Sequence, residues 1–206
     1  MRDEHVQLDL VTRFEKENGI LLPLIRDHYK RRIENCVDEF MLRSRFFDRD
    51  IPENFSASVQ AALYPLDKND LQSRLYAWID QSMEKLGRKR LRAGDPFKLH
   101  QFRTRFKQLL YLAEMVYQSD LTPNLDKPTY QKMKALGQQL GDWHDYFQLW
   151  SKAGEFFYTT TNIHLLEESF QLKKLLTPVH DKLFNAMQDK LNQENLFRIN
   201  FTSGRV

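Results

Sequence analysis

Helical spacing of apolar residues is the feature of this 206-residue sequence that most restricts its fold. Within residues 129–153, such residues recur at intervals of four, three, four and three: Leu136, Leu140, Trp143, Phe147 and Trp150. Residues three and four apart share one side of an α-helix, so this spacing predicts a helix with one buried face. Only seven glycines and seven prolines interrupt the chain, and strand-like alternation is absent apart from the short tail LFRINF. We therefore predict an all-α fold built from antiparallel helical bundles.

Breaks in the helical spacing predict where the helices end. We expect helices over residues 21–47, 69–86, 97–117, 129–153, 162–176 and 178–191, with Pro23 in the first turn of the first one. Residues 48–56 and 87–96 are expected to be connections, and Thr177–Pro178 is expected to separate the last two helices. His5 is expected in a frayed terminus.

Composition excludes several classes of protein. A net charge of +3 is too small for a protein that coats nucleic acid, so any binding of anions must depend on a local patch. The single cysteine, Cys36, excludes internal disulfides and thiolate zinc clusters, and we expect it to be a small buried side chain. No apolar run reaches the ~20 residues of a membrane span, and the N-terminus has no signal-peptide core. We expect a soluble cytoplasmic protein with one domain over residues 1–206, no cofactor and no membrane partner.

Two stripes divide the helix expected at residues 97–117. The predicted core stripe consists of Phe102, Phe106, Leu109, Ala113 and Val116. More than about 100° away lies a second stripe, formed by His100, Arg103, Lys107 and Tyr111.

Like charges one helical turn apart repel, so this second stripe indicates an anion that lies across it. A phosphate chain suits it, because arginine binds two oxygens, lysine supplies a point charge, and histidine and tyrosine donate directional hydrogen bonds. Acids from a neighbouring helix are the alternative, and the sequence leaves both explanations open.

The segment before this helix is also basic. It contains Lys85, Arg88, Lys89, Arg90, Arg92 and Lys98 against the single acid Asp95. Such clustering produces a local field that attracts polyanions, although a solvated linker has the same composition.

Two glycines interrupt the helix expected at residues 129–153. Gly137 and Gly141 each cost roughly 1 kcal/mol relative to alanine, which indicates the close approach of another helix or of a ligand. Asp142, His144 and Asp145 follow as a small polar cluster, in which we expect His144 to be partly buried.

Together the two helices resemble the CHAD family, the conserved histidine α-helical domains. His100, Arg103, Lys107, Leu109 and Tyr111 match its pattern H-x-x-R-x-x-x-K-x-L-R-Y, with Leu110 in place of the second arginine. Leu136, Leu140, Gly141 and Asp145 match L-x-x-L-Q-x-x-L-G-x-x-x-D, with Gly137 in place of glutamine. The sequence GDWHDY is similar to a bacterial branch of the family, the Bacteroidetes type.

A full CHAD domain has two pseudo-symmetric bundles, and the first half is degenerate here. Residues 87–206 show the clearest resemblance, whereas residues 1–86 offer two alignments. Arg26 and Asp27 match the R-D that ends a glycine helix, or else His28 and Arg31 form a degenerate H-x-x-R pair. A shortened two-bundle domain that lacks its first histidine helix is thus one interpretation.

The resemblance implies non-enzymatic binding of inorganic polyphosphate, phosphate or other phosphorylated polyanions, in a protein that associates with polyphosphate granules. The implied phosphate-binding residues are His100, Arg103, Lys107 and Tyr111, flanked by Arg88, Lys89, Arg90 and Arg92, with Arg26, His28 and Arg31 in the first half. Asp145 would orient a basic side chain across the helix pair rather than contact the anion.

Three other functions fit parts of the sequence. The HD pairs His144–Asp145 and His180–Asp181 occur in helical metal-dependent phosphohydrolases, in which His144 and Asp145 would bind a metal. The segment GRKRLR fits nucleic-acid binding, for which we expect weak cross-binding at most. A scaffold for a protein partner is disfavoured because most aromatic residues, among them Trp78, Trp143 and Trp150, fit core stripes.

Overall fold

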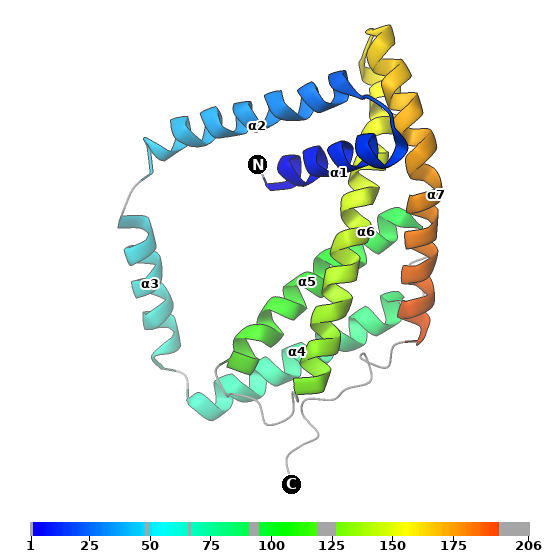
Figure 1. Cartoon of the computed structure of the whole chain (residues 1–206). Coiled ribbons are helices and arrows are strands. Elements are labelled where there is room, and N and C mark those ends of the chain that lie inside the picture. The colour runs from blue at the N-terminus through cyan, green and yellow to red at the C-terminus, as the bar shows by residue number, and fades with distance from the viewer. Residues whose placement is uncertain (1, 48–49, 66, 91–94, 119–126, 194–206) are drawn as a thin grey trace. The chain divides into compact units, whose positions relative to one another are not determined.

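The computed structural model describes residues 2–47, 50–65, 67–90, 95–118 and 127–193, with only the backbone for residues 63, 68, 71, 89, 90 and 116. These ranges form helices and contain no strand, which confirms the all-α prediction (Figure 1). The helices are α1 (Arg2–Asn18), α2 (Pro23–Ser44), α3 (Asp50–Leu63), α4 (Lys68–Arg90), α5 (Pro96–Gln118), α6 (Lys127–Thr159) and α7 (Ile163–Gln193).

The chain divides into two compact units. The first unit comprises Met1–Asp48 and Asp142–Phe184, and the second comprises Arg49–Gly141 and Asn185–Val206. Helices α6 and α7 are each divided between the two units. The single domain expected over residues 1–206 stays a prediction.

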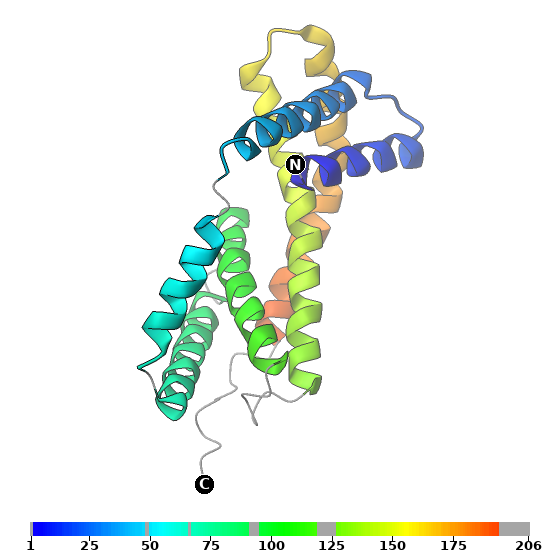
Figure 2. The ribbon, with the colours of Figure 1, turned by 90° about the vertical axis from the view of Figure 1, so that its left-hand side faces the viewer.

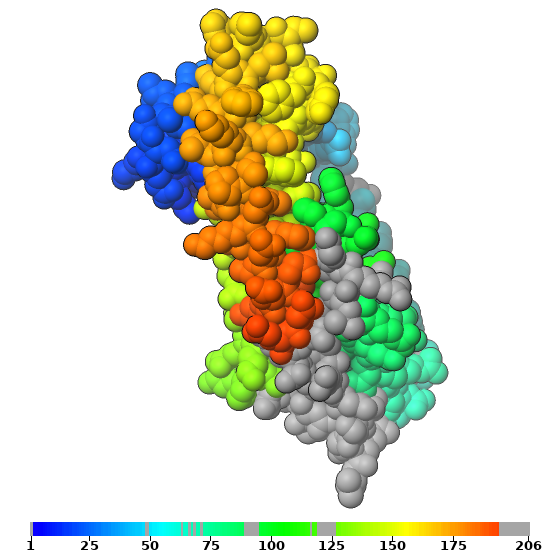
Figure 3. All heavy atoms as spheres, turned by 90° about the vertical axis from the view of Figure 1, so that its right-hand side faces the viewer, coloured from blue at the N-terminus to red at the C-terminus, as the bar shows by residue number. Residues whose placement is uncertain are grey.

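Four helical segments enclose the core of the first unit. Their buried side chains are Leu10, Val11 and Phe14 of α1, Leu22, Ile25 and Tyr29 at the start of α2, Leu149, Ala153 and Phe156 of α6, and Leu172 and Leu176 of α7. On the surface of this unit, the end of α6 and the first part of α7 form one continuous face, with α1 beside α7 (Figure 3).

In the second unit, α5 lies between α4 and the first part of α6 (Figure 2). Phe102, Phe106, Leu109 and Ala113 are buried, which confirms the core stripe of α5, while the side chain of Val116 lies outside the described part. The α6 stripe is buried from Leu136 to Phe147, and Trp150 is half-buried. The periodicity of the two motif helices therefore identified their core faces.

Several predicted boundaries were wrong. Helix α3 begins at Asp50 inside the expected loop, because Pro52 falls in its first turn, where no backbone N–H is needed. Helix α7 continues through Pro178, with the buried side chains of Leu176 and His180 packed on either side of the proline. Helix α4 likewise continues through Gly87, and α1 gives the N-terminal segment around His5 a regular helix. The tail LFRINF lies outside the described residues.

The expectation that the aromatic residues lie in the core was also wrong for part of the chain. Trp78 is 49% exposed, and Phe40, Phe46 and Phe55 are more exposed still. None of the described side chains of α3 is buried, so its apolar residues face outward. Cys36 is half-buried rather than fully enclosed. None of the described helices combines the length and apolar content that a membrane span requires.

Candidate functional site

Helix α5 displays the predicted cationic row on the side away from its buried stripe. His100, Arg103 and Lys107 are half-buried and Tyr111 is 52% exposed. The Lys107 Nζ lies 5.5 Å from the centroid of the Tyr111 ring, within the range of a cation–π contact. We call these four residues the α5 row.

The acids at either end of the α5 row have other partners. At the start of α5, Asp95 accepts a 2.7 Å hydrogen bond from the Lys98 backbone N–H and lies 2.9 Å from the Lys98 Nζ. These contacts with Lys98 lower the pKa of the Asp95 carboxyl. Toward the other end, the Tyr130 hydroxyl donates a 2.9 Å hydrogen bond to Glu114.

Arg103 and Lys107 have no carboxylate within 4.0 Å in the described part of the chain. The alternative explanation of the row, in which acids from a neighbouring helix neutralise it, therefore has no support among the described residues. Two cations one helical turn apart keep their charge available for an anion from outside.

The flanking basic segment is described only in part. Arg88 forms an ion pair with Glu84 one turn earlier on α4. For Lys89 and Arg90 only the backbone is described, at the end of α4, and Arg92 lies outside the described residues. Of the predicted flanking residues, the structure therefore gives a side-chain environment to Arg88 alone.

Close packing of α6 against α5 explains two departures from the family pattern. A Cβ atom added to Gly137 would lie 2.6 Å from Leu110 Cδ2 and 3.7 Å from Phe106 Cε1. Leu110 stands where the family pattern has an arginine, and Gly137 stands where it has a glutamine. These two residues lie next to each other and form an apolar contact between α5 and α6. The expectation that another helix approaches closely was wrong for Gly141, whose added Cβ would meet nothing within 4 Å, and the approach of a ligand there stays a prediction.

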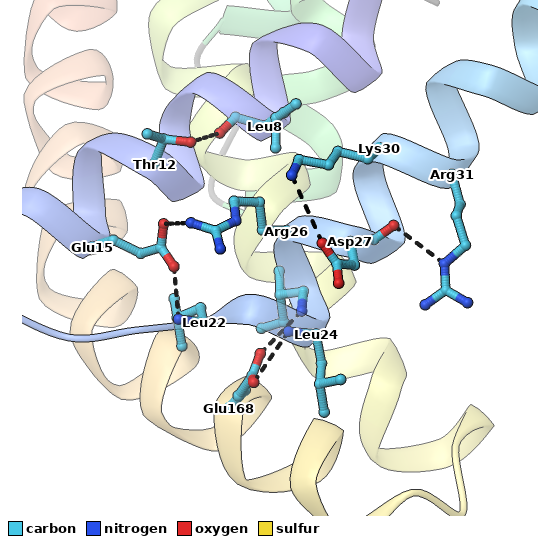
Figure 4. Close-up of polar contacts among 11 residues, drawn as sticks. Leu8, Thr12, Glu15, Leu22, Leu24, Arg26, Asp27, Lys30, Arg31 and Glu168 are labelled. Carbon is cyan, nitrogen blue, oxygen red and sulfur yellow. Dashed lines mark hydrogen bonds and ion pairs between the residues drawn. The ribbon is translucent and has the colours of Figure 1, made fainter.

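The candidate residues of the first unit, Arg26, His28 and Arg31, lie on α2, and Figure 4 shows the polar contacts of Arg26 and Arg31. The Arg26 Nη1 lies 3.3 Å from Glu15 Oε2 of α1. The Arg31 Nε donates to the backbone carbonyl of Asp27 at 3.3 Å, and that residue's carboxylate lies 3.8 Å from the Lys30 Nζ.

His28 lies at the edge of the apolar core of the first unit. Its ring meets the Phe156 ring edge-on, with centroids 4.9 Å apart. Burial lowers the pKa of His28, and the positive charges of Lys152, Arg32 and Arg31 lower this pKa further. The neutral imidazole is therefore favoured in the folded protein.

Two glutamates that the sequence analysis missed hold the start of α2. Glu15 is 7% exposed, and its second carboxylate oxygen accepts a 2.7 Å hydrogen bond from the Leu22 N–H. Glu168 of α7 accepts hydrogen bonds from the Leu24 and Ile25 N–H groups at 3.1 and 3.0 Å (Figure 4). A carboxylate at a helix N-terminus satisfies free N–H groups and complements the helix dipole.

The two HD pairs lie within the first unit. His144 is buried, with its Nδ1 3.7 Å from Asp145 Oδ1, and the Asp145 backbone carbonyl accepts a hydrogen bond from Gln7 at 3.1 Å. His180 is buried too and stacks on Trp150 with ring centroids 4.7 Å apart. Among the described residues, no group of three His, Cys, Asp or Glu side chains is placed to hold a metal ion.

Comparison with known proteins identifies one match. A family model described as the CHAD domain matches residues 1–152, which include α1 to α5 and most of α6. No curated protein and no solved structure matches the chain.

Proposed function

The chain belongs to the CHAD-domain family, which is associated with polyphosphate binding, and from this we propose that it binds inorganic polyphosphate through the α5 row. Binding leaves the phosphoanhydride bonds intact, since CHAD domains are generally non-catalytic. The observation that best supports this proposal is the absence of carboxylates within 4.0 Å of Arg103 and Lys107 in the described structure.

Each member of the α5 row has a separate role in this proposal. Arg103 binds two phosphate oxygens through its guanidinium fork, and Lys107 adds a point charge one turn further along the helix. His100 and Tyr111 donate hydrogen bonds at the two ends of the row. Successive members lie about 5–6 Å apart, so one extended anion can contact several of them at once.

The flanking basic residues and the first-unit residues take subordinate roles. We assign Arg88, Lys89, Arg90 and Arg92 to attraction of the polyanion, because charges beyond direct contact still raise its local concentration. Arg26, His28 and Arg31 are the weaker candidates, because Arg26 is paired with Glu15 and the neutral form of His28 is favoured. Orientation of a basic side chain by Asp145 likewise stays a proposal.

A measurement of polyphosphate affinity in matched variants tests this function. The double variant R103Q/K107Q removes two charges from the α5 row, and K132Q/K134Q removes two exposed charges from α6 in the same unit. Titration calorimetry at fixed salt should show at least a hundredfold weaker binding for R103Q/K107Q and less than threefold for K132Q/K134Q. Equal losses in the two variants would mean that only net charge matters, and the α5 row would not be the site.

Competition distinguishes polyphosphate from nucleic acid. Phosphate contacts alone do not separate the two polyanions, so single-stranded RNA should displace bound polyphosphate only weakly at the same salt concentration. Displacement by RNA at lower concentrations than by polyphosphate itself would favour nucleic-acid binding through the GRKRLR segment instead.

A further inference from the structure

A second group of cations lies on α4 and α5, around a cavity that the polyphosphate proposal does not use. This cavity has a volume of about 180 Å³ and is lined by Trp78, Lys85 and Leu86 of α4 and by Arg105, Gln108 and Leu109 of α5, among others. Arg105 follows Arg103 by two residues, so it projects about 200° further around the helix axis. The cavity therefore opens on nearly the opposite side of α5 from the α5 row.

The two cations of this cavity have no carboxylate partner among the residues that the structure describes. Neither Lys85 nor Arg105 has a carboxylate within 4.0 Å in the parts of the chain that the structure describes. The acid next to Lys85 in the sequence, Glu84, is paired with Arg88. Positive charges that converge on one cavity without an internal counter-ion favour an anionic ligand.

The remaining lining favours a flat apolar ring. Leu86 and Leu109 are 2% and 1% exposed and form an apolar base, whereas Trp78 is 49% exposed at the cavity. A half-exposed indole beside an apolar surface is a stacking platform for aromatic and heterocyclic rings. The Gln108 amide can donate to and accept from polar atoms at the edge of such a ring.

Size limits the ligand further. A cavity of about 150 Å³ holds one benzene ring, whereas sites for drug-sized ligands span roughly 300–1,000 Å³. The α4–α5 cavity is therefore large enough for one ring system and leaves any further part of the ligand outside. A bare phosphate chain would leave its apolar base without a partner.

From these observations we propose that the α4–α5 cavity binds a nucleoside monophosphate. The base stacks on Trp78 above Leu86 and Leu109, and the phosphate lies between Lys85 and Arg105. This site is separate from the α5 row in both residues and ligand, so it stands whether or not the chain binds polyphosphate.

Calorimetric titration of the full chain with three probes tests the proposal. AMP contains both the ring and the phosphate, adenosine contains only the ring, and inorganic phosphate contains only the anion. AMP should bind at least tenfold more tightly than either of the other two. Inorganic phosphate that binds as tightly as AMP would overturn the proposal, and so would a failure of AMP to bind at millimolar concentration.

Variants locate the binding of AMP. K85Q/R105Q should weaken AMP binding at least tenfold, whereas K132Q/K134Q and R103Q/K107Q should change it less than threefold. AMP should also quench the tryptophan fluorescence of the wild type but not of W78F, in which only Trp143 and Trp150 remain. Far-ultraviolet circular dichroism checks that each variant keeps its helices.

A single-stranded oligonucleotide without a terminal phosphate separates a nucleotide site from a nucleic-acid site. Weaker binding of this oligonucleotide than of AMP supports the proposal. Tighter binding that depends on Trp78 would overturn it in favour of nucleic acid. Polyphosphate affinity should fall less than threefold in K85Q/R105Q, as in K132Q/K134Q, so failure of this proposal can be told apart from failure of the polyphosphate proposal.

Discussion

Helices α2 and α5 both contain a histidine followed three residues later by an arginine, but their surroundings differ. On α2, three of the charges near His28 have carboxylate partners: Arg26 with Glu15, Lys30 with Asp27, and Arg32 with Glu4 at 3.1 Å. Within the described structure, Arg31 itself donates only to the backbone carbonyl of Asp27. On α5, Arg103 and Lys107 have no such partner in the described part of the chain. Most of the charge around the α2 histidine is thus paired within the first unit, whereas the described residues provide no carboxylate for Arg103 or Lys107 of α5.

The neighbouring helices cause this difference. Helix α1 returns against α2 through a turn in which Gly19 adopts a φ of +63°, and the acids Glu4 and Glu15 of α1 then face α2. Helix α6 contributes Gly137 next to Leu110 of α5, an apolar contact that offers no counter-ion. The helices packed beside a cationic row therefore decide whether its charges have carboxylate partners.

The largest expected effect compares equivalent arginines of the two helices. R103Q should weaken polyphosphate binding about 10- to 100-fold, which corresponds to the loss of one charge-assisted contact worth about 1.5–3 kcal/mol. R31Q removes the same charge from α2 and should weaken binding less than threefold. Titration calorimetry at one pH and salt concentration measures both. Equal losses would place α2 in the binding site together with α5.

A stability effect is expected at Glu15. E15A leaves the Leu22 N–H without its 2.7 Å partner and removes the counter-ion of Arg26. The free energy of unfolding should fall by about 2 kcal/mol, measured by urea denaturation. E17A removes an exposed acid of the same helix and should change stability by less than about 0.5 kcal/mol.

The polyphosphate affinity of the E15A variant should be measured as well as its stability. The affinity should stay within twofold of the wild type under native conditions, because the contacts of Glu15 with Leu22 and Arg26 stabilise the first unit. An affinity loss as large as that of R103Q would show that the α2 contacts serve binding rather than stability.

A smaller effect separates Gly137 from Gly141 on α6. G141A places its Cβ in open space and should stabilise the protein by about 1 kcal/mol through helix propensity. G137A places its Cβ 2.6 Å from Leu110 Cδ2, so displacement of that side chain should cancel this gain or reverse it. Thermal or urea denaturation measures both.

The background L110A tests the cause of this difference. It removes the obstructing methyl groups, so G137A should become more favourable there than in the wild type. A gain from G137A that is the same in both backgrounds would show that Leu110 does not restrict this position.

Helix geometry explains which features could be predicted from the sequence. The core stripe of α5 and the row opposite it need only the period of one helix, so Phe102 and Arg103 were assigned to different sides. The capping of α2 by Glu168 joins residues 144 positions apart, and no local spacing signals it. The predicted loop around Pro52 and the predicted helix break at Pro178 were wrong, because the effect of a proline depends on its position within the helix and on the packing around it.

The surroundings of individual side chains are the other feature that the sequence could not predict. Trp78 fits a core stripe by spacing, yet it lies half-exposed at the α4–α5 cavity. Arg105 and Lys85 are distant in the sequence and converge only because α4 packs on α5. Spacing assigns a residue to a face, whereas packing decides what that face meets.

The smallest expected effect is the pH dependence that His28 confers on stability. Burial, then the charges of Lys152, Arg32 and Arg31, lower the pKa of His28 in the folded protein, and Glu155 opposes this shift. The unfolded chain therefore binds more protons below about pH 6.5, so stability falls as the pH drops through that value toward the folded pKa. Urea denaturation between pH 7.5 and 5.5 should show a shallower loss for H28Q than for the wild type, with the other histidines common to both.

Repeating this pH measurement with added polyphosphate tests whether the polyanion binds against α2 or to α5 alone. A polyanion bound against α2 would favour charged His28 and remove the difference in slope between the wild type and H28Q. A polyanion bound to α5 alone would leave that difference in place. We expect the difference to persist, because Arg32 and Lys152 beside His28 already have carboxylate partners within the first unit. Its disappearance on addition of polyphosphate would show that the polyanion binds against α2.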